Sequence, residues 1–228
     1  MQSISFDIIT APDLIAGSRL YGLKGLDQHA ITNVMLYKQR QQRDETLPLH
    51  LQRLVAVSLV IAEGDELSSI QLQSDDEAQL LRELFAILES ESCRIYWQQN
   101  SVLALLQFRA LKFAIPLPQD WPLSRTDQRR AMQCGWFDLH QMLAVEGGDN
   151  SLNELASLMA LPLPPGIASG ECREIENSAQ LVVLQQGCLA NAQHIYLLYL
   201  RLAMIQGVLC GDTYQAALES VRLNLKNE

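Results

Sequence analysis

Few residues of this sequence have the type and spacing that chemistry requires. The carboxylate of Asp7 stands in an alternating, β-branched segment, where it would bind a single ion weakly or accept hydrogen bonds from backbone or helix donors. Metal sites and redox motifs often show short spacings such as HxH, HxxxH or CxxC. No such spacing occurs among the histidines and cysteines, which are His29, His50, His140, His194, Cys93, Cys134, Cys172, Cys188 and Cys210. We expect surface or capping histidines and free or buried thiols.

The candidates for contacts with nucleic acid are a basic cluster and three tryptophans. Lys and Arg side chains contact phosphates, and aromatic rings stack on bases. The candidate phosphate-binding cluster consists of Arg125, Arg129 and Arg130. The simpler interpretation of this cluster is a solvated loop and helix start. Core or groove-lining positions are the simpler interpretation of the tryptophans, Trp97, Trp121 and Trp136.

The overall charge of the chain is acidic. The sequence has 17 Lys and Arg against 26 Asp and Glu, a formal net charge of −9. Nucleic-acid binding draws much of its affinity from cationic contacts to phosphate, so this balance favours a protein partner, with single-stranded nucleic acid as the alternative. No run approaches the roughly 18 apolar residues of a membrane span. The N-terminus also lacks the basic and apolar regions of a signal peptide, so we expect a cytoplasmic protein with no membrane contact.

The order of the predicted elements indicates an α/β fold. A strand over residues 3–10 precedes a helix and an exposed, charged connection over 38–45. Later strands are expected at 54–62 and 66–73, which form a hairpin, and at 93–97 and 136–139. Helices are expected at 74–89, 101–113, 139–145, 152–159, 178–189, 190–208 and 212–225. Three antiparallel strands followed by helix-linked parallel strands form the ribonuclease H-like arrangement, a mixed five-stranded sheet flanked by helices. We expect one domain over residues 1–228, with an extended helical part from about 178 packed on it.

Six segments occur together in an order that carries a family resemblance. They are residues 6–10 (FDIIT), 51–58 (LQRLVAVS), 109–111 (RAL), 137–139 (FDL), 151–156 (SLNELA) and 196–201 (YLLYLR). With these segments the chain resembles the predicted 3′–5′ exonucleases related to the exonuclease domain of family B DNA polymerases. Those proteins belong to the DEDD-type, ribonuclease H-like exonucleases.

The resemblance implies a site with two Mg²⁺ or Mn²⁺ ions, which activate a water and stabilise the leaving oxygen. In that family an Asp and a Glu two residues apart on the first strand share one face of the sheet. A further Asp begins the helix after the fourth strand. A Tyr and an Asp four residues apart lie on one face of a late helix.

In this sequence one of these five positions keeps its acid. That acid is Asp7, and the degenerate positions are Ile9, Val102, Gly187 and Asn191. No acid occurs anywhere from residue 93 to residue 119, so a small shift of the alignment does not restore the second motif. One carboxylate and one amide cannot hold two divalent ions. We therefore expect no catalytic residue and no resident metal or cofactor, with Asp7 as the ligand of any single ion that binds.

Three functions of different classes remain open. The first is a catalytically inactive exonuclease-like protein that serves nucleic-acid metabolism as a binding or scaffold module. The second is an active exonuclease that uses Mg²⁺ or Mn²⁺ on relocated ligands, drawn from Asp7, Asp13, Asp138 and Glu154. The third is a structural subunit of a larger complex, which would present an exposed apolar patch.

Overall fold

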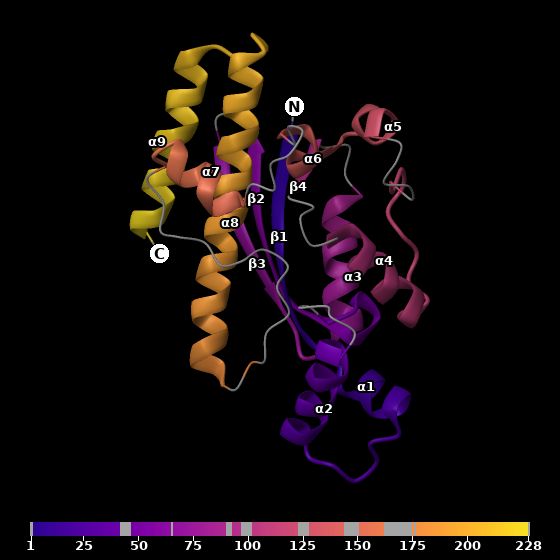
Figure 1. The fold of residues 1–228 in the computed structure, drawn as a ribbon. Coiled ribbons are helices and arrows are strands. Elements are labelled where there is room, and N and C mark those ends of the chain that lie inside the picture. Colours follow the sequence, from indigo (N-terminus) through magenta and orange to yellow (C-terminus); the bar gives the residue numbers. More distant parts are fainter. Residues whose placement is uncertain are drawn as a thin grey trace.

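The computed structural model describes residues 2–41, 47–64, 66–89, 93–96, 102–122, 128–143, 151–161, 175 and 177–227. In these described residues one sheet contains five strands. The strands are β1 (Gln2–Pro12), β2 (Gln52–Glu63), β3 (Glu66–Gln73), β4 (Cys93–Tyr96) and β5 (Trp136–Asp138). Their order is β3-β2-β1-β4-β5 (Figure 1), antiparallel within β1–β3 and parallel from β1 through β4 to β5. This order confirms the expected ribonuclease H-like sheet.

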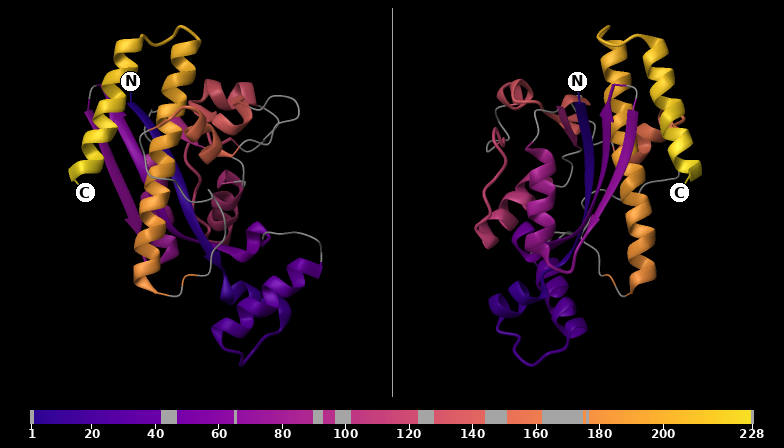
Figure 2. Two further views of the ribbon diagram at one scale, coloured as in Figure 1. Left: turned by 60° about the vertical axis from the view of Figure 1, so that its left-hand side comes forward. Right: turned by 180° about the vertical axis from the view of Figure 1, so that it is seen from behind.

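Helices cover both faces of the sheet (Figure 1, Figure 2). One face carries α3 (Glu77–Leu88) and α4 (Val102–Phe113), and the other carries α7 (Leu152–Leu158), α8 (Ser178–Ile205) and α9 (Gly211–Asn227). The helices α1 (Leu14–Tyr21) and α2 (Gln28–Gln41) form a lobe at one end of the sheet. Three short helices are η1 (Leu49–Leu51), α5 (Gln128–Gln133) and α6 (Leu139–Leu143).

Strand β1 is the central strand, and its residues are buried on both faces because helices cover both. Successive side chains of a strand point to opposite faces. Phe6 and Ile8 belong to the core that α3 and α4 close. Ser5 points the other way, since its hydroxyl donates to the backbone carbonyl of Ala192 on α8 (2.8 Å). The alternation therefore directs Asp7 towards α8.

Two sequence-based expectations about helices are wrong. The helices expected at 178–189 and 190–208 are one helix, α8, of 28 residues. No proline interrupts it, and a single glycine such as Gly187 costs only about 1 kcal/mol relative to Ala, which the burial of α8 on the sheet offsets. The connection expected over 38–45 is helical as far as Gln41, because Ile31 and Met35 of α2 pack in a small core; residues 42–46 lie outside the described part of the chain.

A buried ion network joins the start of α1 and of β2 to α3 and α4. The guanidinium of Arg109, which is 1% exposed, makes two hydrogen bonds to the carboxylate of Glu77 (2.7 and 2.5 Å). It also donates to Oδ2 of Asp13 (2.8 Å) and to the backbone carbonyl of Gln52 (2.8 Å). Lys112 Nζ bonds the same oxygen of Asp13 (2.6 Å). Bidentate, charge-assisted contacts of this kind are strong and demand a fixed geometry, so Arg109 has a structural role.

Candidate functional site

The candidate site lies where β1 faces α8, just beyond the end of β4. The recorded parallel pairing of β1 with β4 ends at Ser5, so Asp7 follows the paired part of β1. Its carboxylate accepts a hydrogen bond from the side-chain amide of Asn191 on α8, with 2.7 Å between Nδ2 and Oδ2. Asp7 is 1% exposed and Asn191 is 0% exposed. Two of the five expected positions, 184 residues apart, are therefore in direct contact.

Ile9, at the position of the family's second carboxylate, lies in an apolar cluster. It packs with Leu184 and Cys188 of α8 and with Ala11, Val55 and Ala56 of the sheet. The thiol of Cys188 is fully buried and lies against Asp7 and Ser58. Burial, and then the charge of Asp7, raise the pKa of Cys188, so the thiol stays protonated at neutral pH. This side of the site is apolar and holds no second anion among the described residues.

The two other degenerate positions are also buried. Gly187 lies on α8 four residues before Asn191 and therefore on the same face of the helix. Val102, the first residue of α4, belongs to the core on the opposite side of the sheet, together with Phe6 and Ile8. The structure thus brings Asp7, Ile9, Gly187 and Asn191 together at the contact of β1 with α8, and places Val102 in the α3–α4 core.

The donor set at this site does not fit the two-metal centre that the family resemblance implies. Mg²⁺ requires several hard oxygen ligands in octahedral geometry. The amide of Asn191 presents an N–H to Asp7, and Ile9 presents only hydrocarbon. Within the described ranges, no three side chains of His, Cys, Asp or Glu gather as metal ligands. The amide of Asn191 instead gives the buried carboxylate of Asp7 the hydrogen bond that a buried polar group requires.

The carboxylates proposed as relocated ligands have other partners. Asp13 caps α1 through the backbone N–H of Ala16 (3.0 Å) and bonds Arg109 and Lys112. Burial opposes ionisation of Asp13, but these three donors outweigh it and lower its pKa. Glu154 completes a capping box with Ser151.

Asp138 is aligned on β5 with Tyr96 of β4, whose side chain lies in the core of the α3–α4 face. The carboxylate of Asp138 accepts a hydrogen bond from the backbone N–H of Gln141 in α6 (3.1 Å). By the alternation of strand residues, this row lies on the opposite face from Asp7. Asp138 therefore contacts the backbone of α6 and lies on the opposite face of the sheet from Asp7.

The remaining candidates divide into core residues and residues that the structure leaves untested. Trp121 and Trp136 are buried and pack edge-on, with ring centroids 5.0 Å apart, which confirms them as core residues. Trp97 and Arg125 lie outside the described residues, as does the side chain of Arg129, while Arg130 is exposed on α5. The arginine cluster stays a prediction.

The histidines differ in their surroundings. His29 and His50 are exposed and His140 is half-buried. The expectation of a surface or capping residue is wrong for His194, which is 2% exposed because α8 packs against the sheet and its neighbouring helices. Burial lowers the pKa of His194 to about 4, so it is neutral at physiological pH. Its Nδ1 has no hydrogen-bond partner among the described residues.

Sequence reasoning missed Cys188 as a member of the site. The signal was present, because Cys188 precedes Asn191 by three residues, a spacing that places both on one face of a continuous helix. Because two helices were expected, ending at 189 and beginning at 190, Cys188 and Asn191 were not expected to share a helical face. Ser58 pairs with Asp7 across β1 and β2, a register that no local pattern specifies.

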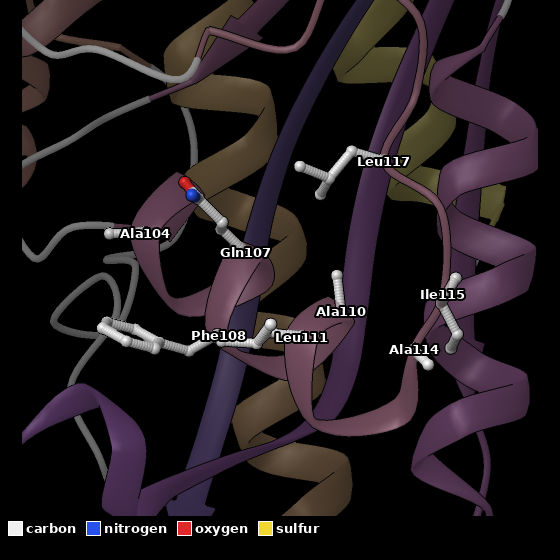
Figure 3. Close-up of a pocket in the computed structure, with 8 residues that line it drawn as sticks. All are labelled: Ala104, Gln107, Phe108, Ala110, Leu111, Ala114, Ile115 and Leu117. Carbon is white, nitrogen blue, oxygen red and sulfur yellow. The ribbon is translucent and has the colours of Figure 1, made fainter.

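A separate pocket of about 520 Å³ lies on the other side of the sheet (Figure 3). It is formed by α4 and the segment that follows, and its lining residues are Ala104, Gln107, Phe108, Ala110, Leu111, Ala114, Ile115 and Leu117. The lining is almost entirely apolar, and Phe108 and Leu111 are 45% and 78% exposed. The pocket contains none of the five family positions.

A family model decides the relationship of the chain to known proteins. The model described as predicted 3′–5′ exonuclease related to the exonuclease domain of PolB matches residues 44–228. The chain belongs to this family. Comparisons with curated proteins and with solved structures found no match.

The exonuclease-related match has a boundary that matters for the site. It includes Val102, Gly187 and Asn191, whereas Asp7, β1 and the α1–α2 lobe precede it. The pairing of β1 with β2 along its whole length positions Asp7 next to the matched part of the chain. In the described helices no segment is both long and apolar enough to cross a bilayer.

Proposed function

We propose that this exonuclease-related protein is a catalytically inactive member of its family that acts as a binding or scaffold module in nucleic-acid metabolism. The observation that carries the proposal is the 2.7 Å hydrogen bond from Asn191 to Asp7. Asn191 stands at the position where the family resemblance implies an aspartate on the late helix. Its amide is uncharged and donates to Asp7, so it brings no negative charge to a metal ion. The proposal includes the absence of a resident metal.

The apolar packing around Ile9 supports the same proposal. Leu184 and Cys188 pack in one cluster with Ile9, and these three side chains are at most 5% exposed. A two-metal centre needs room for two hydrated ions and a substrate oxygen. Dense apolar packing at one of its ligand positions leaves neither ligand nor space on that side.

We propose a protein as the partner, with single-stranded nucleic acid as the alternative. The net charge of −9 opposes the approach of a phosphate backbone, and contacts to phosphate supply most non-specific nucleic-acid affinity. We place the protein in a reducing compartment such as the cytoplasm, since Cys134, Cys188 and Cys210 are free.

An exonuclease assay tests the loss of activity. The purified chain is incubated with a labelled single-stranded oligonucleotide and millimolar Mg²⁺ or Mn²⁺, and the products are resolved at single-nucleotide length. We expect no shortening with either metal. Shortening from the 3′ end that is lost in Asp7→Ala would overturn the proposal and establish the relocated-ligand alternative. An Asp75→Ala variant, altered at an exposed carboxylate before α3, is the matched control.

A binding assay tests the partner class. Fluorescence anisotropy of a labelled single strand is measured over a salt series. We expect weak binding at physiological ionic strength. Submicromolar affinity with a steep salt dependence would replace the protein partner by nucleic acid, because the slope of log K against log salt reports the number of phosphates contacted.

A further inference from the structure

The α1–α2 lobe, residues 14–41, differs from the rest of the chain in charge. It contains four of the 17 Lys and Arg and one of the 26 Asp and Glu, so its formal charge is +3 in a chain of −9. The cations are Arg19, Lys24, Lys38 and Arg40, and all four are exposed. No ion pair recorded in the described part of the chain involves any of them. The lobe is therefore a cationic surface on an acidic protein.

The same lobe exposes apolar side chains. Ile15 is 65% exposed, Leu20 57%, Leu26 46% and Tyr37 62%. Exposed aliphatic and aromatic side chains beside arginines are typical of protein interfaces, where Tyr and Arg are enriched. Isolated exposed apolar residues need no explanation, but four on a lobe of 28 residues that also carries the cations indicate a surface with two kinds of contact.

The lobe is held in a fixed position. Ile31 and Met35 of α2 pack with Leu47 and Leu51 in a core of its own. Gly17 of α1 approaches Met35 so closely that a Cβ would lie 2.2 Å from the sulfur. A binding surface held in this way loses little conformational entropy when a partner docks.

The base of the lobe is also anchored to the sheet. Asp13 caps α1 and bonds Arg109 and Lys112, while its own backbone N–H donates to the carbonyl of Leu51 (2.7 Å). The lobe projects at the end of the sheet away from the α8–α9 connection in each view (Figure 1, Figure 2). Its outer surface thus remains open while its base is rigid.

From this combination we infer that the α1–α2 lobe is a docking surface for an acidic, amphipathic segment of a partner protein. Acidic side chains of the partner meet the four lobe cations, and its apolar residues cover Ile15 and Leu20. A phosphate backbone would pair with the same cations, but it has no apolar groups to cover exposed aliphatic side chains. Charge complementarity also guides encounter, because the four exposed cations of the lobe present positive charge on a chain with a net charge of −9.

The inference shares with the proposed function only the claim that the partner is a protein. It does not depend on the state of Asp7, since the lobe lies outside the described contacts of that site and precedes the family match at residue 44. An active exonuclease would leave the inference intact. Loss of the docking surface would likewise leave the inactivity proposal intact.

A synthetic probe tests the inference on the full-length chain. The probe is a labelled amphipathic peptide of about 18 residues, with Leu at helical i, i+3 and i+4 positions and Glu elsewhere. A scrambled peptide of the same composition and a labelled oligo(dT) are measured in parallel by anisotropy over a salt series. We expect the amphipathic peptide to bind at least about tenfold more tightly than the scrambled peptide and oligo(dT), since only it presents a continuous apolar stripe flanked by acidic side chains.

Matched variants assign the binding to the lobe. Arg19→Glu with Arg40→Glu is compared with Arg82→Glu with Arg222→Glu, which changes the net charge equally at exposed positions on α3 and α9. We expect about a tenfold loss of peptide affinity in the first double variant and less than a twofold loss in the second. Ile15→Ser should lower the affinity of the chain for the peptide without affecting any residual binding of oligo(dT).

Three results would overturn the inference. Equal losses in the two double variants would show that only net charge matters. Tighter binding of oligo(dT) than of the peptide, lost in the lobe variant, would make the surface a nucleic-acid site. Failure of the peptide to bind the unaltered chain at any ionic strength would remove the surface as an acidic-segment site. Circular dichroism confirms that each variant is folded before binding is measured.

Discussion

Replacing Asn191 by Asp probes the buried contact on which the functional proposal rests. Asn and Asp have nearly the same shape, so the substitution changes the chemistry of the contact and preserves its volume. In the unaltered protein Nδ2 of Asn191 donates to Asp7 at 2.7 Å. In the Asn191→Asp variant, two carboxylates would face each other in a site where both residues are at most 1% exposed.

The expected cost follows from two effects. A hydrogen bond to a charged group contributes about 1.5–3 kcal/mol, and the substitution removes it. Two unit charges about 4 Å apart would repel by about 4 kcal/mol at an effective dielectric constant of 20. One of the carboxyls can instead take up a proton and restore a hydrogen bond. We therefore expect the free energy of unfolding to fall by about 3 kcal/mol at pH 7.

The pH dependence gives the prediction its sign. The folded variant retains a proton on the carboxyl pair at pH values where unfolded Asp side chains, with a pKa of about 3.9, have lost theirs. The folded state then binds more protons than the unfolded state, so the stability of the variant falls as the pH rises through that interval. The difference from the unaltered protein should be small near pH 4 and largest at neutral pH.

Urea unfolding followed by circular dichroism at several pH values measures this difference. Asn33→Asp, at an exposed position of α2, is the matched control and should change stability by less than about 0.5 kcal/mol. A difference for Asn191→Asp below about 1 kcal/mol at pH 7, or one that does not vary with pH, would refute the reasoning. Millimolar Mg²⁺ should leave the variant unchanged, and a clear stabilisation by Mg²⁺ would show that two carboxylates suffice to bind the metal.

Three further predictions concern the packing and the thiols. Arg109→Met should destabilise the fold by about 3–5 kcal/mol in urea unfolding, because it leaves buried carboxylates without their partner. Gly17→Ala should lower stability by about 1–2 kcal/mol, since the new methyl group meets Met35; in a double-mutant cycle this cost should shrink in a Met35→Ala background. Iodoacetamide should alkylate exposed Cys210 under native conditions, where hydrogen bonds from Thr213 lower its pKa, and leave Cys188 unmodified until urea unfolds the chain. Peptide mass spectrometry at both sites distinguishes these outcomes, and rapid alkylation of Cys188 in the folded protein would contradict the buried site.

Local sequence patterns were enough to predict the architecture and the scarcity of acidic residues at the metal-ligand positions that the family resemblance implies. The strand over 3–10 and the hairpin over 54–73 follow from periodicity and from turn residues, which are local signals. A strand places Asp7 and Ile9 on one face whatever surrounds it. The lack of any acid between residues 93 and 119 is likewise independent of the fold.

Which side chains meet depended on how distant parts of the chain dock in the fold. The bond between Asp7 and Asn191 joins residues 184 positions apart, and the Arg109 contacts with Asp13 and Glu77 span 96 and 32 positions. Helix continuity through residue 189 was also supported by packing, because residues 187–198 of α8 are all buried against the sheet and the neighbouring helices. Local periodicity specifies which face a side chain occupies, whereas the neighbour opposite that face depends on how β1 and α8 dock. For that reason the sequence could predict which family positions lack an acid, whereas the structure was needed to find Asn191 bonded to Asp7 and Ile9 packed in an apolar cluster.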